Sequence, residues 1–305
     1  MRYLTQLNYI HIVAKTGSIR KAAEQMNITS TALNRRILAL EDELGYPIFE
    51  RLPQGVRLNV AGELLIQHIR STMADLSKVM SQISDLSGVR RGHVSIAGGS
   101  EVIGALLPAR IAHYRRDHSN VTFEILRRAP QAALRALDDF SADISLVLGP
   151  VVPSEYQILA TVSLQLMMRM HRNHPLAGKD SLRLADCQDY PAIIPSESAG
   201  LYDLLYVAQT KKGVKLQQII TSESYEFMTY YCRYEDAISF ALPLSQDDTD
   251  AISDDIIMKP FDTRDQLTGL LHIVQAKGRV LPVASAKFAE ELVRYLNTHF
   301  PDDLH

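Results

Sequence analysis

The chain has 305 residues, of which 46% are hydrophobic and 22% charged, a composition that fits about two globular domains and excludes a disordered or collagen-like chain. No run of 18 uncharged apolar residues occurs, which excludes a transmembrane helix, and the lack of an apolar signal core in the first residues leads us to expect a cytoplasmic protein. The net charge of −3 is unevenly spread, because residues 1–91 hold 12 Lys and Arg against 8 Asp and Glu. This excess indicates either that a polyanion meets the N-terminal part alone or that this part has an ordinary solvated surface.

The first 45 residues carry the pattern of three short helices. Apolar residues at helical spacing predict a first helix, and Ser18 is a good N-cap for a second one. Either Thr29 or Ser30 caps a third helix, which runs to about Leu44 and ends at Gly45. Two short helices joined by a three-residue break predict a helix-turn-helix. We expect the third helix to turn four residues inward: Leu33, Ile37, Leu40 and Leu44.

The solvent face of the third helix favours contact with DNA over a small helical bundle without a DNA role. It carries Thr31, Asn34 and Arg35, which are short hydrogen-bonding side chains beside an arginine. Such side chains suit a helix that enters the major groove, whereas Glu and Lys are more usual on a merely solvated face.

A short basic hairpin follows. Short segments at 47–51 and 56–58 are separated by Pro53-Gln54-Gly55, which predicts a hairpin, and each strand carries an arginine, Arg51 and Arg57. A basic hairpin beside a helix-turn-helix predicts a wing that touches phosphates or the minor groove.

A long helix is predicted from the Asn59 cap to about Ser87, followed by a hinge over 88–92. Apolar residues recur in alternating steps of four and three, which favours a two-stranded coil over a lone amphipathic helix packed on its own domain. Thr72 is the polar position of this seam, and the dimerising residues would be Leu65, Ile69, Leu76, Val79, Ile83 and Leu86.

Ordered motifs cover residues 14–65: TGS before the second helix, KAAE at its centre, ALEDELG, the F-E-R wing strand, the GVRL return strand and AGE at the start of the long helix. Together they resemble the DNA-binding head of LysR-type transcriptional regulators, and the rest of the chain resembles the family's effector domain more loosely. The resemblance implies an α/β protein overall, with an N-terminal winged helix-turn-helix over 1–59, a linker helix and hinge over 60–92, and a two-lobed effector domain like a type 2 periplasmic binding protein over 93–305.

The resemblance also implies partners. Members of the family bind double-stranded DNA as dimers or tetramers, sense a small metabolite and recruit or block RNA polymerase. Phosphate contacts would come from Lys21, Arg35, Arg36, Arg51 and Arg57. Base readout would come from Ser30, Thr31 and Asn34, and Ser18 lies beside them at the start of the second helix.

The third helix departs from the family pattern. Where the family commonly reads Ser-Gln-Pro-Ala-Val-Ser-Arg, this chain reads Thr-Ser-Thr-Ala-Leu-Asn-Arg over 29–35. Ser30 cannot reach as far as a glutamine, and the amide of Asn34 can pair bidentately with adenine. We expect DNA binding with an altered target sequence, or weaker direct readout that DNA shape compensates.

From His93 onward short apolar strands alternate with helices, which predicts βαβ units and a mostly parallel sheet. Ligands bind such sheets at the carboxyl ends of strands, near helix N-termini. Two arginines at one strand end, Arg127 and Arg128, could clamp a carboxylate or other anion bidentately, or lie in a solvated loop. The strand-end loops supply these candidate effector-binding residues: Gly99, Ser100, Glu101, Arg127, Arg128, Ala129, Leu148, Gly149, Pro195, Ser196 and Ser198.

The chain order predicts two lobes joined by two crossings, with residues 93–161 and 268–305 in lobe I and 162–267 in lobe II. Two crossings make a cleft that can close on a ligand. Where the family often has a Gly-rich approach to a Leu-Pro near the cleft, this chain carries Phe240, which we expect to narrow the pocket or to form an aromatic wall.

No catalytic, metal or cofactor site is indicated. His171 and His174 are three apart but lack a supporting Cys or carboxylate, so a polar turn is favoured over a metal site. G-x-S-x-G, P-loop and H-E-x-x-H motifs are absent, and we expect a non-enzyme without a cofactor. The main hypothesis is a DNA-binding transcriptional regulator that senses a small anionic metabolite. The alternative is a cytoplasmic solute-binding module with vestigial DNA binding, and an enzyme on the same two-lobed fold is a third, remote hypothesis.

Overall fold

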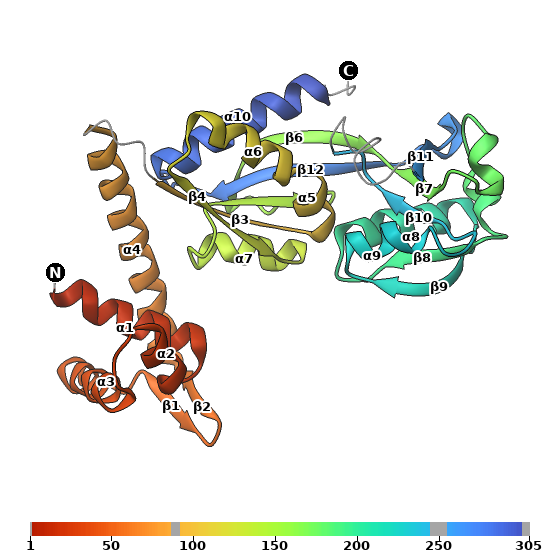
Figure 1. Ribbon diagram of the computed structural model, residues 1–305. Helices are drawn as coiled ribbons and strands as arrows, with labels where there is room; N and C mark the ends of the chain where they lie inside the picture. Colours follow the sequence, from red (N-terminus) through yellow and green to blue (C-terminus); the bar gives the residue numbers. More distant parts are fainter. Residues whose placement is uncertain (1, 87–91, 245–254, 301–305) are drawn as a thin grey trace. The chain divides into compact units, whose positions relative to one another are not determined.

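The computed structural model describes residues 2–86, 92–244 and 255–300 (Figure 1). The chain forms two compact units, Met1–Met80 and Ser81–His305. The predicted hinge at 88–92 lies outside the described residues except for Gly92. No helix within the described ranges is both long and apolar enough to cross a membrane.

The N-terminal unit is a winged helix-turn-helix, as the sequence predicts. Its core is formed by the inward faces of the helices, where the fully buried pair Ala22 and Ala23 leaves room for the neighbouring helices. Leu33, Ile37 and Leu40 are buried, but the prediction for Leu44 is wrong: it is 42% exposed in the last helical turn. The elements are α1 (Arg2–Thr16), α2 (Ile19–Gln25), α3 (Ser30–Leu44), β1 (Phe49–Leu52), β2 (Gly55–Leu58) and α4 (Val60–Leu86).

Local hydrogen bonds set the ends of these helices. The Ser18 hydroxyl accepts from the backbone N–H of Lys21 and caps α2, and the Thr29 hydroxyl caps α3, so Ser30 is the first helical residue. Gly45 ends α3 with a φ of 77°, a conformation that suits glycine. Asn59 Oδ1 accepts from the N–H of Gly62 at 2.8 Å and begins α4.

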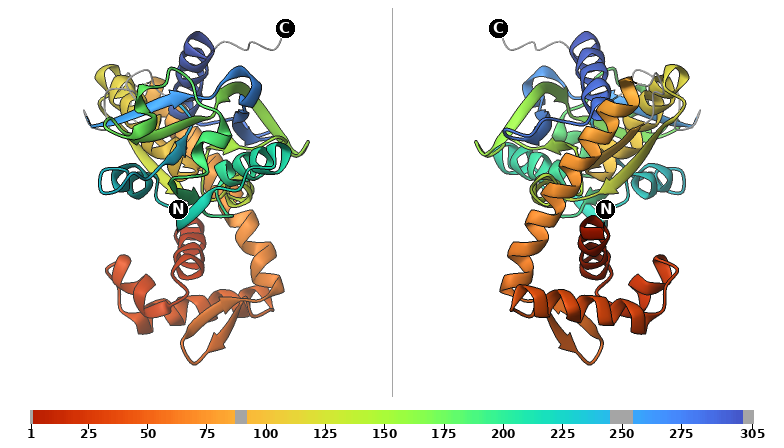
Figure 2. Two further views of the ribbon diagram at one scale, coloured as in Figure 1. Left: turned by 90° about the vertical axis from the view of Figure 1, so that its right-hand side faces the viewer. Right: turned by 90° about the vertical axis from the view of Figure 1, so that its left-hand side faces the viewer.

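The wing is fastened to the turn between α1 and α2. Leu52 pairs with Gly55 around a two-residue loop, and the N–H of Val56 donates to the carbonyl of Gly17 at 2.9 Å. A Cβ at Gly55 would lie 2.3 Å from that same carbonyl oxygen, and its φ of 147° also favours glycine. Figure 2 shows the hairpin extending beyond α1, α2 and α3.

The long helix α4 contributes to the N-terminal core before it leaves it. Ile66 and Ile69 are both buried there, so the prediction that Ile69 belongs to a dimer seam is wrong: it is 0% exposed against its own chain. Leu76 and Val79 are exposed. The side chains of Ile83 and Leu86 lie outside the described residues, and the seam beyond Ile69 stays a prediction.

The C-terminal unit is built on a five-stranded sheet in the order β4-β3-β5-β12-β6. The strands β3, β4 and β5 are parallel, as predicted, but β12 runs antiparallel to both β5 and β6. Successive side chains of a strand point to opposite faces of the sheet. Ile96 therefore packs in the larger hydrophobic core on one face, and Ala97 packs in the smaller core on the other face. The bounds are β3 (Gly92–Gly98), β4 (Val121–Arg127), β5 (Ile144–Leu148), β6 (Tyr156–Gln165) and β12 (Thr268–Ala276).

Helices cover both faces of this sheet (Figure 1). On one face lie α6 (Leu107–Asp117) and α10 (Val283–His299), and α7 (Pro130–Asp138) covers the other. Between β3 and β4 the chain forms two helices, α5 (Ser100–Ala105) and α6, which meet at Leu106.

Lobe II is smaller and mixed. A three-stranded antiparallel sheet combines β7 (Met167–His171), β10 (Ser239–Ala241) and β11 (Ile256–Pro260). A parallel pair joins β8 (Pro191–Pro195) to β9 (Gln217–Ser222). Their companions are α8 (Gly200–Lys212), α9 (Tyr225–Tyr231) and the 3₁₀ helices η1 (Pro175–Gly178), η2 (Leu184–Cys187) and η4 (Thr263–Asp265).

The crossings between the lobes lie close to their predicted places. β6 stays in the lobe I sheet to Gln165, so the first crossing is at Leu166 rather than after residue 161. The second crossing precedes Thr268, the first residue of β12.

A buried carboxylate lies just before the second crossing. Asp265, whose side chain is 3% exposed, accepts from the Arg183 guanidinium at 2.6 Å, from the N–H of Leu184 at 3.0 Å and from the Lys212 ammonium at 3.0 Å. The hydrogen bond from Arg183 is the largest cause that holds the pKa of Asp265 below its usual value of 3.8, and the other donors add to it against the opposing effect of burial.

We expect Asp265→Asn to lower the free energy of unfolding by about 2 kcal/mol at pH 7, because it removes charge-assisted hydrogen bonds. A depressed carboxyl pKa stabilises the fold fully above the unfolded-state value and loses that effect as the pH falls toward the folded-state value. The difference between the variant and the wild type should therefore shrink below about pH 4. Urea unfolding followed by circular dichroism at several pH values measures this difference.

The exposed Asp189 provides the control, and Asp189→Asn should change stability by less than about 0.5 kcal/mol. An equal loss in both variants would show that the Asp265 network does not stabilise the crossing.

Candidate functional site

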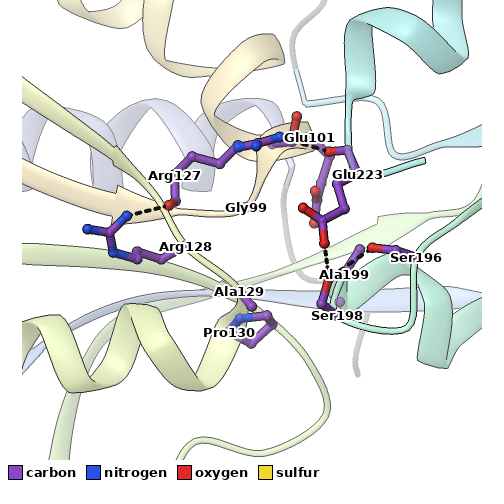
Figure 3. Close-up of a pocket in the computed structure, with 12 residues that line it drawn as sticks. Gly99, Glu101, Arg127, Arg128, Ala129, Pro130, Ser196, Ser198, Ala199 and Glu223 are labelled. Atoms are coloured by element: carbon purple, nitrogen blue, oxygen red, sulfur yellow. Dashed lines mark hydrogen bonds between the residues drawn. The ribbon is translucent and has the colours of Figure 1, made fainter. Parts of the chain in front are cut away.

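A cavity of ≈ 220 Å³ opens where loops of lobe I meet loops of lobe II (Figure 3). Most of the predicted strand-end residues line it, together with their chain neighbours Pro130, Ala199 and Gly200, and only Glu223 comes from a loop that was not predicted. The lining comprises Gly99, Ser100, Glu101, Arg127, Arg128, Ala129, Pro130, Ser196, Ser198, Ala199, Gly200 and Glu223.

Strand direction brings these residues together. β3 and β4 are parallel, so the loops that follow Gly98 and Arg127 leave the same edge of the sheet. In lobe II the parallel pair β8 and β9 does the same for the loops that follow Pro195 and Ser222. Glu223 was missed because β9 was not recognised in the sequence. The signal that could have found it is the Ser-Glu-Ser run over 222–224, which begins at the last residue of that strand.

Two helices begin at the cavity without a capping side chain. Ala129 precedes α7 and Ala199 precedes α8, and neither N-cap side chain accepts a hydrogen bond from its helix. Free N–H groups and the helix dipole give such ends a partial positive charge that attracts anions. Gly200 allows α8 to begin so close to β5, because a Cβ there would lie 2.5 Å from the carbonyl oxygen of Leu148.

The two arginines do not form a single clamp, which was one of the two arrangements that the sequence left open. Arg127 Nη1 donates across the cleft to the carbonyl of Glu223 at 3.4 Å, whereas Arg128 Nη1 donates to the carbonyl of Arg127 at 2.9 Å. Figure 3 shows the two side chains pointing apart. Successive side chains at a strand end point to opposite sides, so only Arg127 reaches toward lobe II.

Hydroxyl and carboxyl groups complete the lining. The Ser198 hydroxyl donates to Glu223 Oε1 at 3.0 Å and lies 2.9 Å from the hydroxyl of Ser196. The Ser100 hydroxyl accepts from the N–H of Tyr225 at 3.1 Å, which joins the start of α5 to the start of α9 across the lobes. Glu101 is only 6% exposed, and this burial raises the pKa of its carboxyl group.

Four predicted effector residues lie outside this cavity. Leu148 and Gly149 line two neighbouring cavities of ≈ 190 and ≈ 230 Å³, while Pro195 is buried at the end of β8. The prediction for Phe240 is wrong. This side chain is 1% exposed and stacks on Phe261 with ring centroids 6.3 Å apart, because β10 is buried inside lobe II.

The predicted DNA-contacting residues lie on α2, α3 and the wing. Ser30, Thr31 and Arg35 are exposed along α3, and Lys21 is exposed on α2. Asn34 is half-buried, and its Oδ1 accepts from Arg51 Nη2 of the wing at 2.9 Å.

Two other cations of this surface have partners within the unit. Arg57 Nη2 pairs with Glu50 at 2.7 Å on the neighbouring strand. Arg36 donates a hydrogen bond to the Tyr9 hydroxyl of α1, and its guanidinium carbon lies 4.9 Å from the Tyr9 ring centroid. These contacts hold the two guanidinium groups in defined places rather than leaving them free in solvent.

The histidine pair near residue 172 belongs to a turn. His174 Nδ1 accepts from the N–H of Leu176 and caps η1. In the described parts of the chain no group of three or more His, Cys, Asp or Glu side chains could hold a metal ion.

Two family models match the chain. Residues 4–63 match a bacterial regulatory helix-turn-helix protein model of the lysR family, and residues 87–297 match the LysR substrate binding domain. Among solved structures, CbnR complexed with its target DNA superposes with a TM-score of 0.67 at 17% identity, covering 95% of this chain and 99% of that one.

Curated relatives are transcriptional regulators. BudR of Raoultella terrigena is 30% identical over 70% of this chain and 76% of its own length. The RuBisCO operon transcriptional regulator of Allochromatium vinosum is 28% identical, and the match spans 65% of each protein. The chain thus spans slightly less than two thirds of the length of this relative.

The bond between Ser100 and Tyr225 can be tested by hydrogen–deuterium exchange. Ser100→Ala removes a hydrogen bond worth about 1 kcal/mol, so the amide of Tyr225 should exchange about fivefold faster through local opening. Ser196→Ala is the matched control, because its hydroxyl contacts only Ser198 among the hydrogen bonds described. Unchanged exchange at Tyr225 in Ser100→Ala would contradict a hydrogen bond that joins the lobes there.

Proposed function

The chain belongs to the LysR family, and we propose that it is a sequence-specific DNA-binding transcriptional regulator controlled by a small molecule in the interlobe cavity. The family consists of transcriptional regulators rather than enzymes. The observation that carries the proposal is that one chain combines a winged helix-turn-helix, with an exposed polar and basic recognition helix, and a two-lobed unit with a cavity at its cleft.

The recognition helix supports DNA binding through its exposed side chains. Thr31 and Arg35 are exposed and can approach a major groove. Arg51 of the wing donates a hydrogen bond to Asn34 on the same helix. We assign base readout to Ser30, Thr31 and Asn34, and phosphate contacts to Lys21, Arg35 and the wing arginines.

The chemistry of the cavity supports a ligand with an anionic group. The uncapped starts of α7 and α8 offer backbone N–H groups, and Arg127 extends its guanidinium toward lobe II. A carboxylate or a similar anion satisfies these donors.

Regulation would follow from closure of the lobes. A ligand that contacts both lobes favours a closed cleft, and in a homodimer or homotetramer this changes the spacing of the DNA-binding units. Dimers of this kind read half-sites roughly 34 Å apart. The exposed Leu76 and Val79 of α4 support a helix–helix seam between two copies of the chain. RNA polymerase is an expected further partner of a cytoplasmic regulator bound at a promoter.

Genomic DNA fragments captured by the purified protein at physiological salt, with competitor DNA, test the proposal directly. Discrete peaks that share a two-fold-related motif are expected, together with an affinity that falls steeply with salt concentration. A protein that binds the cavity ligand but has no salt-dependent affinity for DNA would instead be a solute-binding module with vestigial DNA binding.

Arg35→Ala should weaken DNA binding at every sequence and lower the salt slope by about one, because it removes a phosphate contact. Asn34→Ala should cost about 1–3 kcal/mol of discrimination at one base pair and leave other positions unchanged. Binding to a library of single-base variants of the captured motif, measured by fluorescence anisotropy, separates these effects. Equal losses at all base substitutions for Asn34→Ala would contradict its role in readout.

Arg51→Ala should reduce discrimination at the same base pair as Asn34→Ala, because Arg51 holds the Asn34 amide. In the double variant the loss of discrimination should not exceed that of Asn34→Ala alone. Strictly additive losses would mean that Arg51 acts on the DNA independently of Asn34.

A further inference from the structure

We propose that the ligand of the interlobe cavity is a zwitterion of the α-amino-acid class, whose ammonium group binds Glu101. This inference rests on the proposed function, because it concerns the same cavity. It goes further by requiring a cationic group on the ligand as well as an anionic one.

Glu101 is the most unusual group in the cavity. It lies in the first turn of α5, is 6% exposed and lines the cavity wall. The carboxyl group of Glu101 folds back over Gly99. A Cβ on residue 99 would lie only 2.7 Å from Glu101 Oε1, so a glycine at this position makes room for the carboxyl group.

This carboxyl group has no basic partner among the residues that the structure describes. Its pKa is raised by burial, and only the hydrogen bond from its own backbone N–H opposes that rise. A buried carboxylate without a cation is costly, whereas one that receives a charged N–H donor is stabilised. A ligand ammonium group supplies that donor without any change in the protein.

The opposite charge of such a ligand has its own place in the cavity. Arg127 and the uncapped starts of α7 and α8 form an electropositive side, as expected for binding a carboxylate. The charged side chains of the lining also balance, with Glu101 and Glu223 against Arg127 and Arg128. A ligand that carries both charges therefore fits this lining better than a simple anion.

The size of the cavity agrees with a small zwitterion. Its volume of ≈ 220 Å³ lies below the roughly 300–1,000 Å³ of pockets for drug-sized ligands. Ser196 and Ser198 provide hydroxyl groups that can meet a polar side chain of the ligand.

A buried carboxyl group could act in another way, which the experiment must separate. In its protonated form Glu101 could donate a hydrogen bond to a simple anion. Glutamine mimics that protonated form, since its amide also donates, but it cannot neutralise an ammonium group. Glu101→Gln therefore distinguishes the two modes.

The test uses the full-length protein and pairs of probes that differ only in the amino group: alanine and propionate, aspartate and succinate, glutamate and glutarate, and phenylalanine and 3-phenylpropionate. The remaining standard α-amino acids are screened in the same way. Binding is measured by isothermal titration calorimetry. At least one amino acid should bind ten times more tightly than its deaminated partner, and Glu101→Gln should weaken that amino acid at least tenfold.

Glu290→Gln, an exposed position on α10, is the matched control and should leave the affinity within twofold of the wild-type value. Equal binding of an amino acid and its deaminated partner would overturn the inference. So would wild-type affinity in Glu101→Gln, or a complete screen in which no amino acid binds. The paired probes decide the matter on the wild-type protein even if the variant folds poorly.

These failures are distinct from failure of the proposed function. If the deaminated acids bind as tightly as the amino acids and the captured genomic DNA gives discrete peaks, the zwitterion inference is wrong but the proposed regulator, with an anionic ligand, stands. Loss of salt-dependent DNA binding would contradict the proposed function whatever the cavity binds.

Discussion

The direction of the strands is the constraint on which both lobes depend. Because β3 and β4 run parallel, the loops after Gly98 and Arg127 must leave the sheet at one edge, and helices must begin there. The parallel pair β8 and β9 imposes the same condition on lobe II. Uncapped helix starts, an arginine and two carboxyl groups thus meet at the cleft without any long-range sequence motif.

The two lobes are joined by only two crossings of the chain. The chain leaves lobe I at Leu166 and returns before Thr268, so only two short segments connect the lobes, which is the connectivity of proteins that close by a hinge. The buried Asp265 lies just before the second crossing and forms ion pairs with Arg183 and Lys212. The hydrogen bond from the N–H of Tyr225 to the Ser100 hydroxyl joins the two lobes across the cleft. In the mechanism proposed above, a ligand that adds contacts at the cleft would compete with or reinforce these hydrogen bonds and so shift the balance between open and closed lobes.

In the N-terminal unit, contacts of the wing fix the positions of polar side chains on the neighbouring helices. Gly55 lies against Gly17 with no room for a side chain, and Arg51 of the wing holds the amide of Asn34 on the recognition helix. Arg36 and Arg57 are likewise held by Tyr9 and Glu50. Side chains that are already oriented lose less conformational entropy on binding, which would favour the DNA contacts proposed above.

The sequence by itself determined the features that depend on local patterns. Helical spacing, the caps at Ser18 and Asn59, and Gly45 locate the winged helix-turn-helix, because caps and glycine turns act over a few residues. The strand–helix alternation likewise placed Glu101 and Arg127 at the ends of parallel strands, close to the cavity that both line.

Only the tertiary structure decided which apolar and charged side chains face a core, a partner or a ligand. Ile69 fits the heptad seam yet is buried in its own unit, Phe240 stacks on Phe261 inside lobe II, and Arg128 turns away from Arg127. Glu223 joins the cavity through the pairing of β8 with β9, two strands that are distant in the sequence. Periodicity states that a residue lies on one face of an element, but the partner of that face depends on how distant segments pack.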